Sequence, residues 1–248
     1  MKYIESAKNA KIKQWKKLHT KKERAKTGQF LVEGKHLVEE ALKMSGTVEE
    51  LLVTSPEMVP QDVDQEIDIY ELSEEAFSAM TETETPQQIA AICTIPHFQE
   101  KEHKRVLLLD AVQDPGNLGT LIRTADAAGL DAVILGDGTV DAYNGKTLRS
   151  AQGSHFHLPI LKQTLSNAIL VLKEKRIPVY GSALKEAKVY QEVPAEEAFA
   201  LIVGNEGAGI DPDLLSMTDQ NLYVPMYGKA ESLNVAIAAA VLLYHLRG

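Results

Sequence analysis

The sequence predicts a two-domain α/β protein, in which a small N-terminal α/β domain precedes a larger α/β domain with a mostly parallel sheet. The 248 residues are 44% hydrophobic and 25% charged, which supplies enough apolar mass for one or two packed domains and excludes a mainly disordered chain. Strand-like and helix-like segments alternate from residue 106 onward, as in sheets with helices on both faces. The charged stretch 99–105 interrupts the apolar pattern, so we expect domains over 1–98 and 104–248.

The first domain contains both helical and strand-like patterns. Ile12, Trp15 and Leu18 recur at three-residue spacing among lysines, which predicts an amphipathic helix over 8–19. The other expected elements are a strand over 30–32, a helix over 34–45, strands over 48–54 and 67–72, a helix beginning at 73–77 and a strand over 89–95.

The second domain alternates strands with helices. The expected elements are strand 106–110, helix 117–128, strand 132–136, helix 143–151, strand 156–161, helix 164–175, strands 177–181, 199–203 and 222–226, and helix 232–246. Ligands of parallel sheets bind beyond the carboxyl ends of the strands. The last helix is apolar nearly all round, which predicts that it is buried against the sheet or a second subunit.

Composition excludes several classes of protein. The single cysteine, Cys93, cannot form an intrachain disulfide and excludes a cysteine-based zinc cluster. The longest strongly apolar stretch, from Val235 to Tyr244, is about half of the ~20 residues that cross a bilayer, and the N-terminus is too charged for a signal peptide. We therefore expect a reduced, cytoplasmic protein with no membrane segment.

The net charge of −9 is unevenly distributed along the chain. Residues 1–28 hold ten Lys and Arg against two acidic residues, a net +8 that leaves −17 for the rest. Residues 49–100 hold thirteen acidic residues and no Lys or Arg. A polyanion would therefore approach by the N-terminal segment, unless this segment is only a solvated or frayed terminus.

Several common motifs are absent. The first strand of the second domain is not followed by G-x-G-x-x-G, which argues against a dinucleotide-binding fold. Gly145-Lys146-Thr147 ends like a Walker A motif, but Val140 stands where that motif needs its first glycine. His155 and His157 lack a third ligand nearby, so we expect ordinary strand residues and no metal site.

Three polar clusters instead follow strands of the second domain, over 110–123, 204–209 and 224–235. Asn117 and Ser232 are each candidates for the N-cap of the next helix. Arg123, taken alone, fits a surface salt bridge, and a lone glycine-rich loop at 204–209 is weak evidence. Together, three polar loops at one sheet edge predict a small-molecule pocket.

These clusters resemble the three signature motifs of the SpoU/TrmH family of RNA ribose methyltransferases, in order and in spacing. The matching positions are Asn117, Gly119 and Arg123 for the first motif, Gly204, Glu206 and Gly209 for the second, and Pro225 through Val235 for the third. Asn9, Lys13, Lys17, Gly28, Phe30, Glu33 and Gly34 resemble the substrate-binding domain found in one branch of the family.

The resemblance implies a fold and a cofactor. The C-terminal part of the parallel sheet would form a deep trefoil knot that binds S-adenosylmethionine, and the protein would be a homodimer with the last helix at its interface. The residues that would hold the cofactor are Gly204, Val224 and Leu233, with Ser182, Ala183, Asn205 and Met226 nearby.

The resemblance also implies a site for methyl transfer to a ribose 2′-hydroxyl. Arg123 would be the catalytic residue, reaching the partner subunit's cofactor, and Asn117, Glu206, Ser232 and Asn234 would complete the site. A guanidinium holds its proton far above neutral pH, so orienting the hydroxyl and a phosphate is easier for Arg123 than acting as a base. Alternatively, the role of Glu206 would be to hold Arg123 or the loop in place.

The expected substrate is RNA rather than DNA, and 23S ribosomal RNA in particular. Lys13, Lys16, Lys17 and Arg24 would contact its phosphates. Alternatives are a transfer-RNA ribose methyltransferase and a non-catalytic RNA-binding factor of ribosome assembly. The intact motifs argue against the non-catalytic factor. A dehydrogenase is excluded because the sequence lacks the glycine fingerprint of that class.

Overall fold

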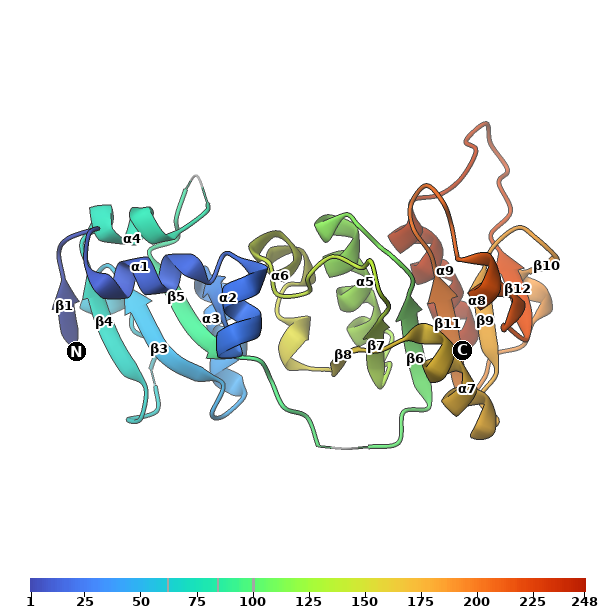
Figure 1. Cartoon of the computed structure of the whole chain (residues 1–248), viewed down its shortest axis with the longest axis horizontal. Helices are drawn as coiled ribbons and strands as arrows, with labels where there is room; N and C mark the ends of the chain where they lie inside the picture. The colour runs from blue at the N-terminus through green and yellow to red at the C-terminus, as the bar shows by residue number, and fades with distance from the viewer. Residues whose placement is uncertain (62, 84, 100) are drawn as a thin grey trace. The chain divides into compact units, whose positions relative to one another are not determined.

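The computed structural model describes residues 1–61, 63–83, 85–99 and 101–248, so Glu100 of the expected linker lies outside the described residues. The chain forms two units, shown with their elements in Figure 1. Unit 1 comprises Met1–His97 and Tyr143–Phe156, and unit 2 comprises Phe98–Ala142 and His157–Gly248.

One segment departs from the expected division. Residues 143–156 were assigned to the second domain, whereas the structure groups them with unit 1. The reason is apolar packing, because Leu148 and Phe156 belong to the same buried cluster as Phe30. The rings of Phe30 and Phe156 stack with their centroids 6.1 Å apart.

Unit 1 is built on a five-stranded mixed sheet in the order β1-β4-β3-β5-β2. β1 pairs with β4 and β4 with β3 in parallel, whereas β5 is antiparallel to both β3 and β2. The strands are β1 (Lys2–Ile4), β2 (Gln29–Glu33), β3 (Val48–Val53), β4 (Asp68–Leu72) and β5 (Ile89–Thr94). The helices are α1 (Ala10–Lys17), α2 (Lys21–Thr27), α3 (Lys35–Lys43), α4 (Glu74–Met80) and α6 (Gly145–Ala151), with short 3-10 turns η1 (Pro56–Met58) and η2 (Ser154–Phe156).

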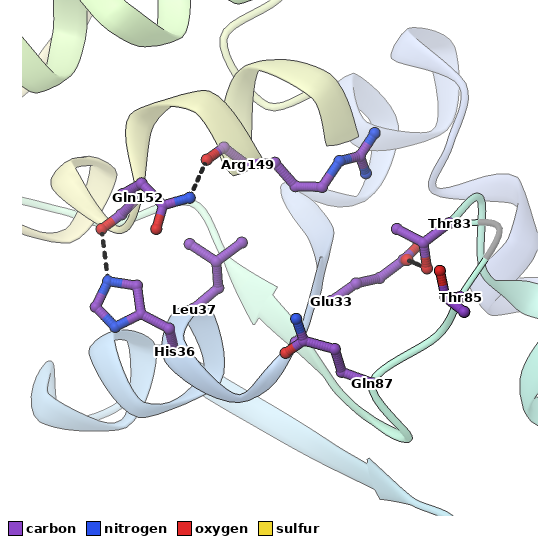
Figure 2. A pocket seen from close by; sticks show the side chains of 9 residues that line it. Glu33, His36, Leu37, Thr83, Thr85, Gln87, Arg149 and Gln152 are labelled. Atoms are coloured by element: carbon purple, nitrogen blue, oxygen red, sulfur yellow. Dashed lines mark hydrogen bonds between the residues drawn. The ribbon is translucent and has the colours of Figure 1, made fainter.

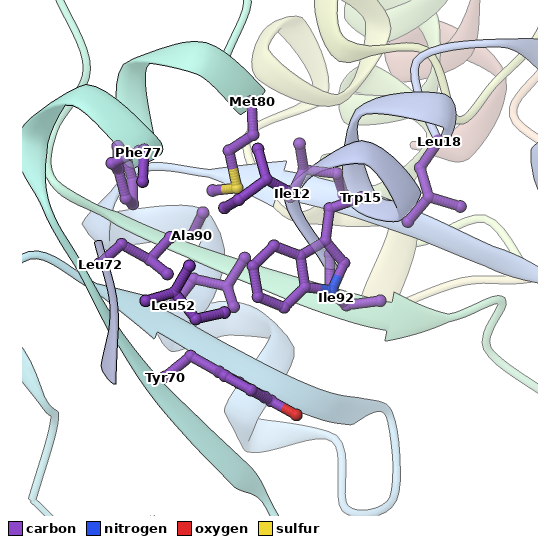
Figure 3. Close-up of a cluster of buried hydrophobic side chains, with 13 residues drawn as sticks. Ile12, Trp15, Leu18, Leu52, Tyr70, Leu72, Phe77, Met80, Ala90 and Ile92 are labelled. Atoms are coloured by element: carbon purple, nitrogen blue, oxygen red, sulfur yellow. The ribbon is translucent and has the colours of Figure 1, made fainter. Parts of the chain in front are cut away.

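Successive strand residues of unit 1 point to opposite faces, and each face has its own core. Leu52 packs on one face with Ile12 and Trp15 of α1 and Phe77 of α4 (Figure 3). Leu51 belongs to the cluster of the other face, with side chains of α3 and α6. The expected apolar stripe of α1 is therefore confirmed as a core stripe.

Two elements of unit 1 were not expected. β1 is only three residues long, and α2 is a charged helix without apolar periodicity. Thr20 caps the start of α2, and Gly28 ends it in the left-handed region at φ 69°.

Unit 2 contains a seven-stranded sheet in the order β10-β12-β9-β11-β6-β7-β8, in which all pairs are parallel. The expected parallel sheet is thus confirmed. Its strands are β6 (Arg105–Leu109), β7 (Ala132–Leu135), β8 (Ile160–Lys162), β9 (Val179–Ser182), β10 (Ala187–Val189), β11 (Phe199–Val203) and β12 (Gln220–Tyr223). Its helices are α5 (Pro115–Ala127), α7 (Leu165–Glu174), α8 (Pro212–Ser216) and α9 (Val235–Arg247), with a 3-10 turn η3 (Tyr190–Glu192).

Some boundaries in the chain differ from the expected ones. The strand expected over 156–161 is wrong at its start, because residues 154–156 form a 3-10 turn and β8 begins only at Ile160. His155 is buried in that turn, and Nδ1 of His157 lies 2.8 Å from Oδ2 of Asp126 on α5. Neither histidine belongs to a strand. β10 and α8 were not expected.

Across the described ranges, no helix is long and apolar enough to span a membrane. In the same ranges, no three His, Cys, Asp or Glu side chains are grouped so that they could hold a metal ion.

Candidate functional site

A cavity of about 210 Å³ lies in unit 2, where the chain leaves β9, β11 and β12 and enters α9. β12 ends at Tyr223, so the loop that leads to α9 begins at Val224 and borders the cavity. Glu206 and Ser232 line this cavity. All seven residues expected to hold the cofactor line it as well: Ser182, Ala183, Gly204, Asn205, Val224, Met226 and Leu233. The structure therefore brings residues from distant segments to one place.

The loop after β11 is held tightly against itself. A Cβ atom at Gly204 would lie 2.1 Å from the carbonyl carbon of Gly209, so only glycine fits there. Asn205 and Gly209 exchange two backbone hydrogen bonds of 2.9 and 3.0 Å. The Asn205 side chain accepts hydrogen bonds from the backbone N–H groups of Gly207 and Ala208 and donates to the carbonyl of Ala111 at 2.9 Å. The backbone groups at the cavity are thus fixed before any ligand arrives.

Glu206 joins this loop to the start of α5. Its Oε2 accepts from the backbone N–H of Gln113 at 3.2 Å, and its Oε1 accepts from the backbone N–H of Asp114 at 3.1 Å and from Nδ2 of Asn117 at 3.0 Å. Partial burial raises the pKa of the Glu206 carboxyl, but these hydrogen bonds outweigh burial and hold the pKa below its ordinary value. An ionised carboxylate that accepts three hydrogen bonds is a poor proton acceptor. Glu206 is therefore suited to positioning the start of α5 against this loop.

Asn117 continues the connection to α9. Its Oδ1 accepts from Nδ2 of Asn234 at 2.9 Å. Asn234 uses its own Oδ1 to accept from the backbone N–H groups of Ala236 and Ile237, at 2.9 and 3.4 Å, and so caps α9. Glu206, Asn117 and Asn234 therefore form one network, which we call the motif clamp, that ties together the three loops.

The structure contradicts both candidate caps. Asn117 is not an N-cap, because Asp114 caps α5 by accepting from the backbone N–H of Asn117 at 2.8 Å. Ser232 is not an N-cap either, because Asn234 fills that role and Ser232 lies exposed in the loop. Pattern alone identifies a cap only to within a few residues, since several polar side chains compete for the same backbone donors.

Arg123 lies on α5, exposed, and does not line the cavity of its own chain. Within the part of the chain that the structure describes, its side chain has no ion pair, so the surface salt bridge is not seen. The guanidinium is free to meet a substrate.

Three of the four expected RNA-binding residues are available on unit 1. Lys13, Lys16 and Lys17 are exposed and lie on one face of α1, opposite Ile12 and Trp15. We call this set the lysine face.

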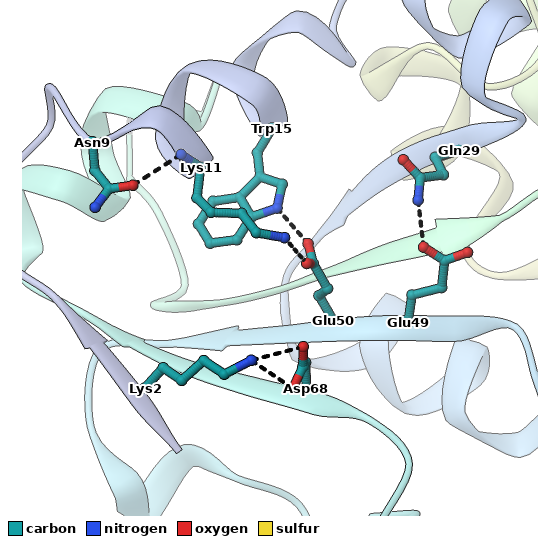
Figure 4. A network of polar contacts seen from close by, with 8 residues as sticks. All are labelled: Lys2, Asn9, Lys11, Trp15, Gln29, Glu49, Glu50 and Asp68. Atoms are coloured by element: carbon teal, nitrogen blue, oxygen red, sulfur yellow. Dashed lines mark hydrogen bonds and ion pairs between the residues drawn. The ribbon is translucent and has the colours of Figure 1, made fainter.

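Other cationic side chains of residues 1–28 form contacts within unit 1. Arg24 is only 5% exposed and donates to the carbonyl of Leu18 at 2.6 Å, which contradicts its expected contact with RNA. Figure 4 shows that Lys11 pairs with Glu50 and that Lys2 pairs with Asp68.

Several residues that line the cavity were missed by the sequence analysis, among them Glu231 and Leu184. Glu231 lines the cavity directly before Ser232, and its place inside the third motif was a usable signal. Leu184 also lines it, although 79% of the residue is exposed, and no motif pointed to it.

Comparison with protein families accounts for most of the chain. Residues 104–244 match the model of the SpoU rRNA Methylase family, and residues 9–91 match the model of the MRM3-like substrate binding domain.

Individual proteins are similar over nearly the full length. The 23S rRNA (guanosine(2553)-2′-O)-methyltransferase RlmP of Bacillus subtilis is 66% identical over 248 residues, which cover all of both chains. An AdoMet-bound rRNA methyltransferase from Sinorhizobium meliloti has a TM-score of 0.87 and 30% identity, covering 99% of this chain and 97% of that one. The SpoU methyltransferase AviRb from Streptomyces viridochromogenes, in complex with AdoMet, has a TM-score of 0.86 and 25% identity, covering 97% of each chain.

Proposed function

Because the chain belongs to the SpoU rRNA methylase family and is an RNA 2′-O-methyltransferase that uses S-adenosylmethionine, we propose that its acceptor is a guanosine ribose in 23S ribosomal RNA. The observation that carries the proposal is the cavity of unit 2, which residues of the second and third motifs line and to which hydrogen bonds of Asn117 join the first motif. The RlmP relative, which is 66% identical, supports the guanosine and the ribosomal substrate.

The lining of the cavity fits a cofactor with positive charge. Glu206 and Glu231 place two carboxylates at its wall, and no Lys or Arg is found among the described residues that line it. A dinucleotide, with its phosphates, would find no cation there. Leu222 and Leu233 provide apolar wall for an aromatic ring, and the fixed loop at 204–209 provides backbone hydrogen-bonding groups.

S-adenosylmethionine supplies a methyl group activated by a sulfonium. The ribose 2′-oxygen would accept this methyl group and would release its proton to solvent. A guanidinium presents several N–H donors in a planar fork, so we assign Arg123 to orienting the hydroxyl and a neighbouring phosphate.

The other proposed site residues support Arg123 and the cavity. The motif clamp holds the start of α5, which carries Arg123, against the loops that border the cavity. We therefore assign Asn117, Glu206 and Asn234 to positioning. Ser232 lines the cavity and is exposed, so it can contact the acceptor.

The exposed apolar side chains of α9 and the position of Arg123 support a homodimer. Ile237 and Tyr244 are 51% and 56% exposed and lie seven residues apart on one face of α9, while Leu242 and Leu246 are buried. A second copy that covers this apolar face would also explain why Arg123 stands outside the cavity of its own chain.

The trefoil knot belongs to this proposal as well. β12 lies between β9 and β10, on the opposite side of β9 from β11, and the loops after β11 and β12 both border the cavity. This strand order and the family membership support a knotted cofactor site.

The domain roles complete the proposal. Residues 1–98, together with the segment 143–156 that packs with them, would bind the RNA through the lysine face, and the rest of 104–248 would hold the cofactor. The protein would act in the cytoplasm, where its ribosomal substrate is made.

The test maps 2′-O-methylation across ribosomal and transfer RNA from a deletion strain, its parent and a complemented strain. One guanosine of 23S rRNA should lose its methyl group in the deletion strain and regain it on complementation. A restored site in tRNA would favour a transfer-RNA enzyme, and no change in either RNA would favour a non-catalytic assembly factor.

A further inference from the structure

Unit 1 contains a second cavity, of about 180 Å³, that none of the motifs identifies. Figure 2 shows it between the end of β2, the start of α3, the loop that carries Thr85 and Gln87, and Arg149 of α6. A space of this size can take a single heterocycle.

The two charged side chains at this cavity differ in how they are held. The Glu33 carboxylate accepts from the backbone N–H of Glu82 at 3.1 Å and from the Thr83 hydroxyl at 2.9 Å, one bond on each oxygen, so each oxygen can accept another. The Arg149 guanidinium is half-buried and forms no ion pair with any residue the structure describes. Among the described residues, a fixed acceptor and a guanidinium without an ion pair therefore border one small space.

The rest of the lining supports a flat ligand. Gln87 accepts from the backbone N–H of Lys35 at 3.0 Å through Oε1, which fixes its amide and leaves Nε2 as a donor. Leu37 is buried and supplies apolar wall. Gly34 has φ +100°, and a Cβ atom there would lie 2.8 Å from Oε1 of Gln87, so a larger residue would crowd the space.

The cavity is linked to the lysine face through His19. Nε2 of His19 lies 2.6 Å from the carbonyl oxygen of Met80, and Nδ1 lies 3.4 Å from Oε1 of Glu82. The end of α1, with Lys16 and Lys17, is thus joined to the loop whose next residue, Thr83, lines the cavity. An RNA backbone bound along these lysines would run close to the cavity.

We propose that this cavity is a subsite for one unpaired nucleobase of the RNA substrate. Single-stranded RNA is read through bases that leave the stack and offer their edges to side chains. Guanine matches best, because its N1–H and N2–H groups can donate to Glu33 and its O6 and N7 can accept from Arg149. The subsite rests on the proposed function, and it takes a recognition base rather than the methylated one, since the two cavities share no lining residue.

The test fills the cavity from the exposed side. Thr85→Trp places an indole at the mouth, and Gln61→Trp, at an exposed position outside the cavity, is the matched control. The substrate is 23S rRNA from the deletion strain with labelled S-adenosylmethionine. For Thr85→Trp, KM for RNA should rise at least tenfold, while kcat, the melting temperature and the affinity for S-adenosylmethionine stay within twofold or a few degrees of wild type and of the control. An unchanged KM would overturn the subsite.

A second variant tests the chemistry of the cavity. Arg149→Met keeps most of the side-chain length and removes the guanidinium, so KM for RNA should rise about tenfold with unchanged cofactor affinity. An equal KM for Arg149→Met and wild type would show that Arg149 reads no base. If wild type itself transfers no methyl group, the proposed function fails; if wild type is active and both variants match it, only the subsite fails.

Discussion

The two units hold the side chains that we propose to be functional in opposite ways. In unit 2, Asn117, Glu206 and Asn234 are bound to one another through hydrogen bonds of 2.9 to 3.0 Å, and their loops have little freedom. In unit 1, Lys13, Lys16 and Lys17 stand free on the surface of α1. Methyl transfer needs atoms held in place, whereas phosphate binding needs only charge at the right face. The comparison predicts that changes in unit 2 alter kcat and that changes in unit 1 alter RNA affinity.

The largest effect is expected at Arg123. Arg123→Ala should lower kcat at least about 100-fold, because one donor to the reacting group is lost. Arg123→Lys keeps the charge without the planar fork and should recover only part of the activity. Cofactor affinity, measured by calorimetry, and the melting temperature should match wild type. A variant with normal kcat would remove Arg123 from the site.

Reversing the charge of the lysine face should give the next largest effect. Lys13→Glu, Lys16→Glu and Lys17→Glu together should weaken RNA binding at least tenfold and reduce the slope of log K against log salt by about 2 to 3. Binding titrations at four salt concentrations measure both. The control reverses Lys101, Lys175 and Lys188, which are also exposed. Equal losses in the two triple variants would mean that only the total charge matters.

Arg24 is a buried cation, unlike the exposed lysine face of the same unit, and we expect it to stabilise the fold rather than to bind RNA. Arg24→Met should destabilise the fold by about 1–3 kcal/mol, because the carbonyl of Leu18 loses a buried charged donor. Thermal and urea unfolding measure the loss. RNA affinity of the folded protein should not change, and a tenfold weaker affinity at full stability would restore Arg24 as a phosphate contact.

The smallest effect concerns pH and the motif clamp. The pKa of Glu206 is lower in the folded protein than the ordinary value, so its contribution to stability is fully present above the unfolded pKa of about 4.3 and is lost as pH falls through the folded pKa. Glu206→Gln removes this titration. The stability difference between wild type and the variant, from urea unfolding at several pH values, should therefore shrink below about pH 4. A difference that grows toward acid would contradict the clamp.

Sequence reasoning predicted the cavity residues of unit 2 better than the RNA-binding residues of unit 1. In unit 2, polar loops after apolar strands were sufficient to predict a small-molecule pocket, because a parallel sheet places its strand ends together. The resemblance to the SpoU/TrmH family then named seven residues, all of which line one cavity. In unit 1, counting cations included Arg24, because composition does not distinguish a buried guanidinium from an exposed one. Arg149 was unpredictable for a different reason, since it lies more than a hundred residues from Glu33 in the sequence and reaches the same cavity only through tertiary packing.

Errors in the fold had a similar physical origin. The short strands β1 and β10 carry too few residues for an alternating pattern, so only their neighbours in the sheet define them. Residues 156–161 read as a strand, but the apolar side chain of Phe156 packs in unit 1 and the segment turns instead. Tertiary contacts decide such short segments.

The most direct test of the central claim uses purified protein, 23S rRNA from the deletion strain and S-adenosylmethionine with a trideuterated methyl group. Mass spectrometry of nuclease fragments then locates the label. The account predicts one trideuteromethyl group on the ribose 2′-oxygen of a single guanosine, absent with Arg123→Ala. Label on a base, label in tRNA alone, or no label with folded protein would contradict it.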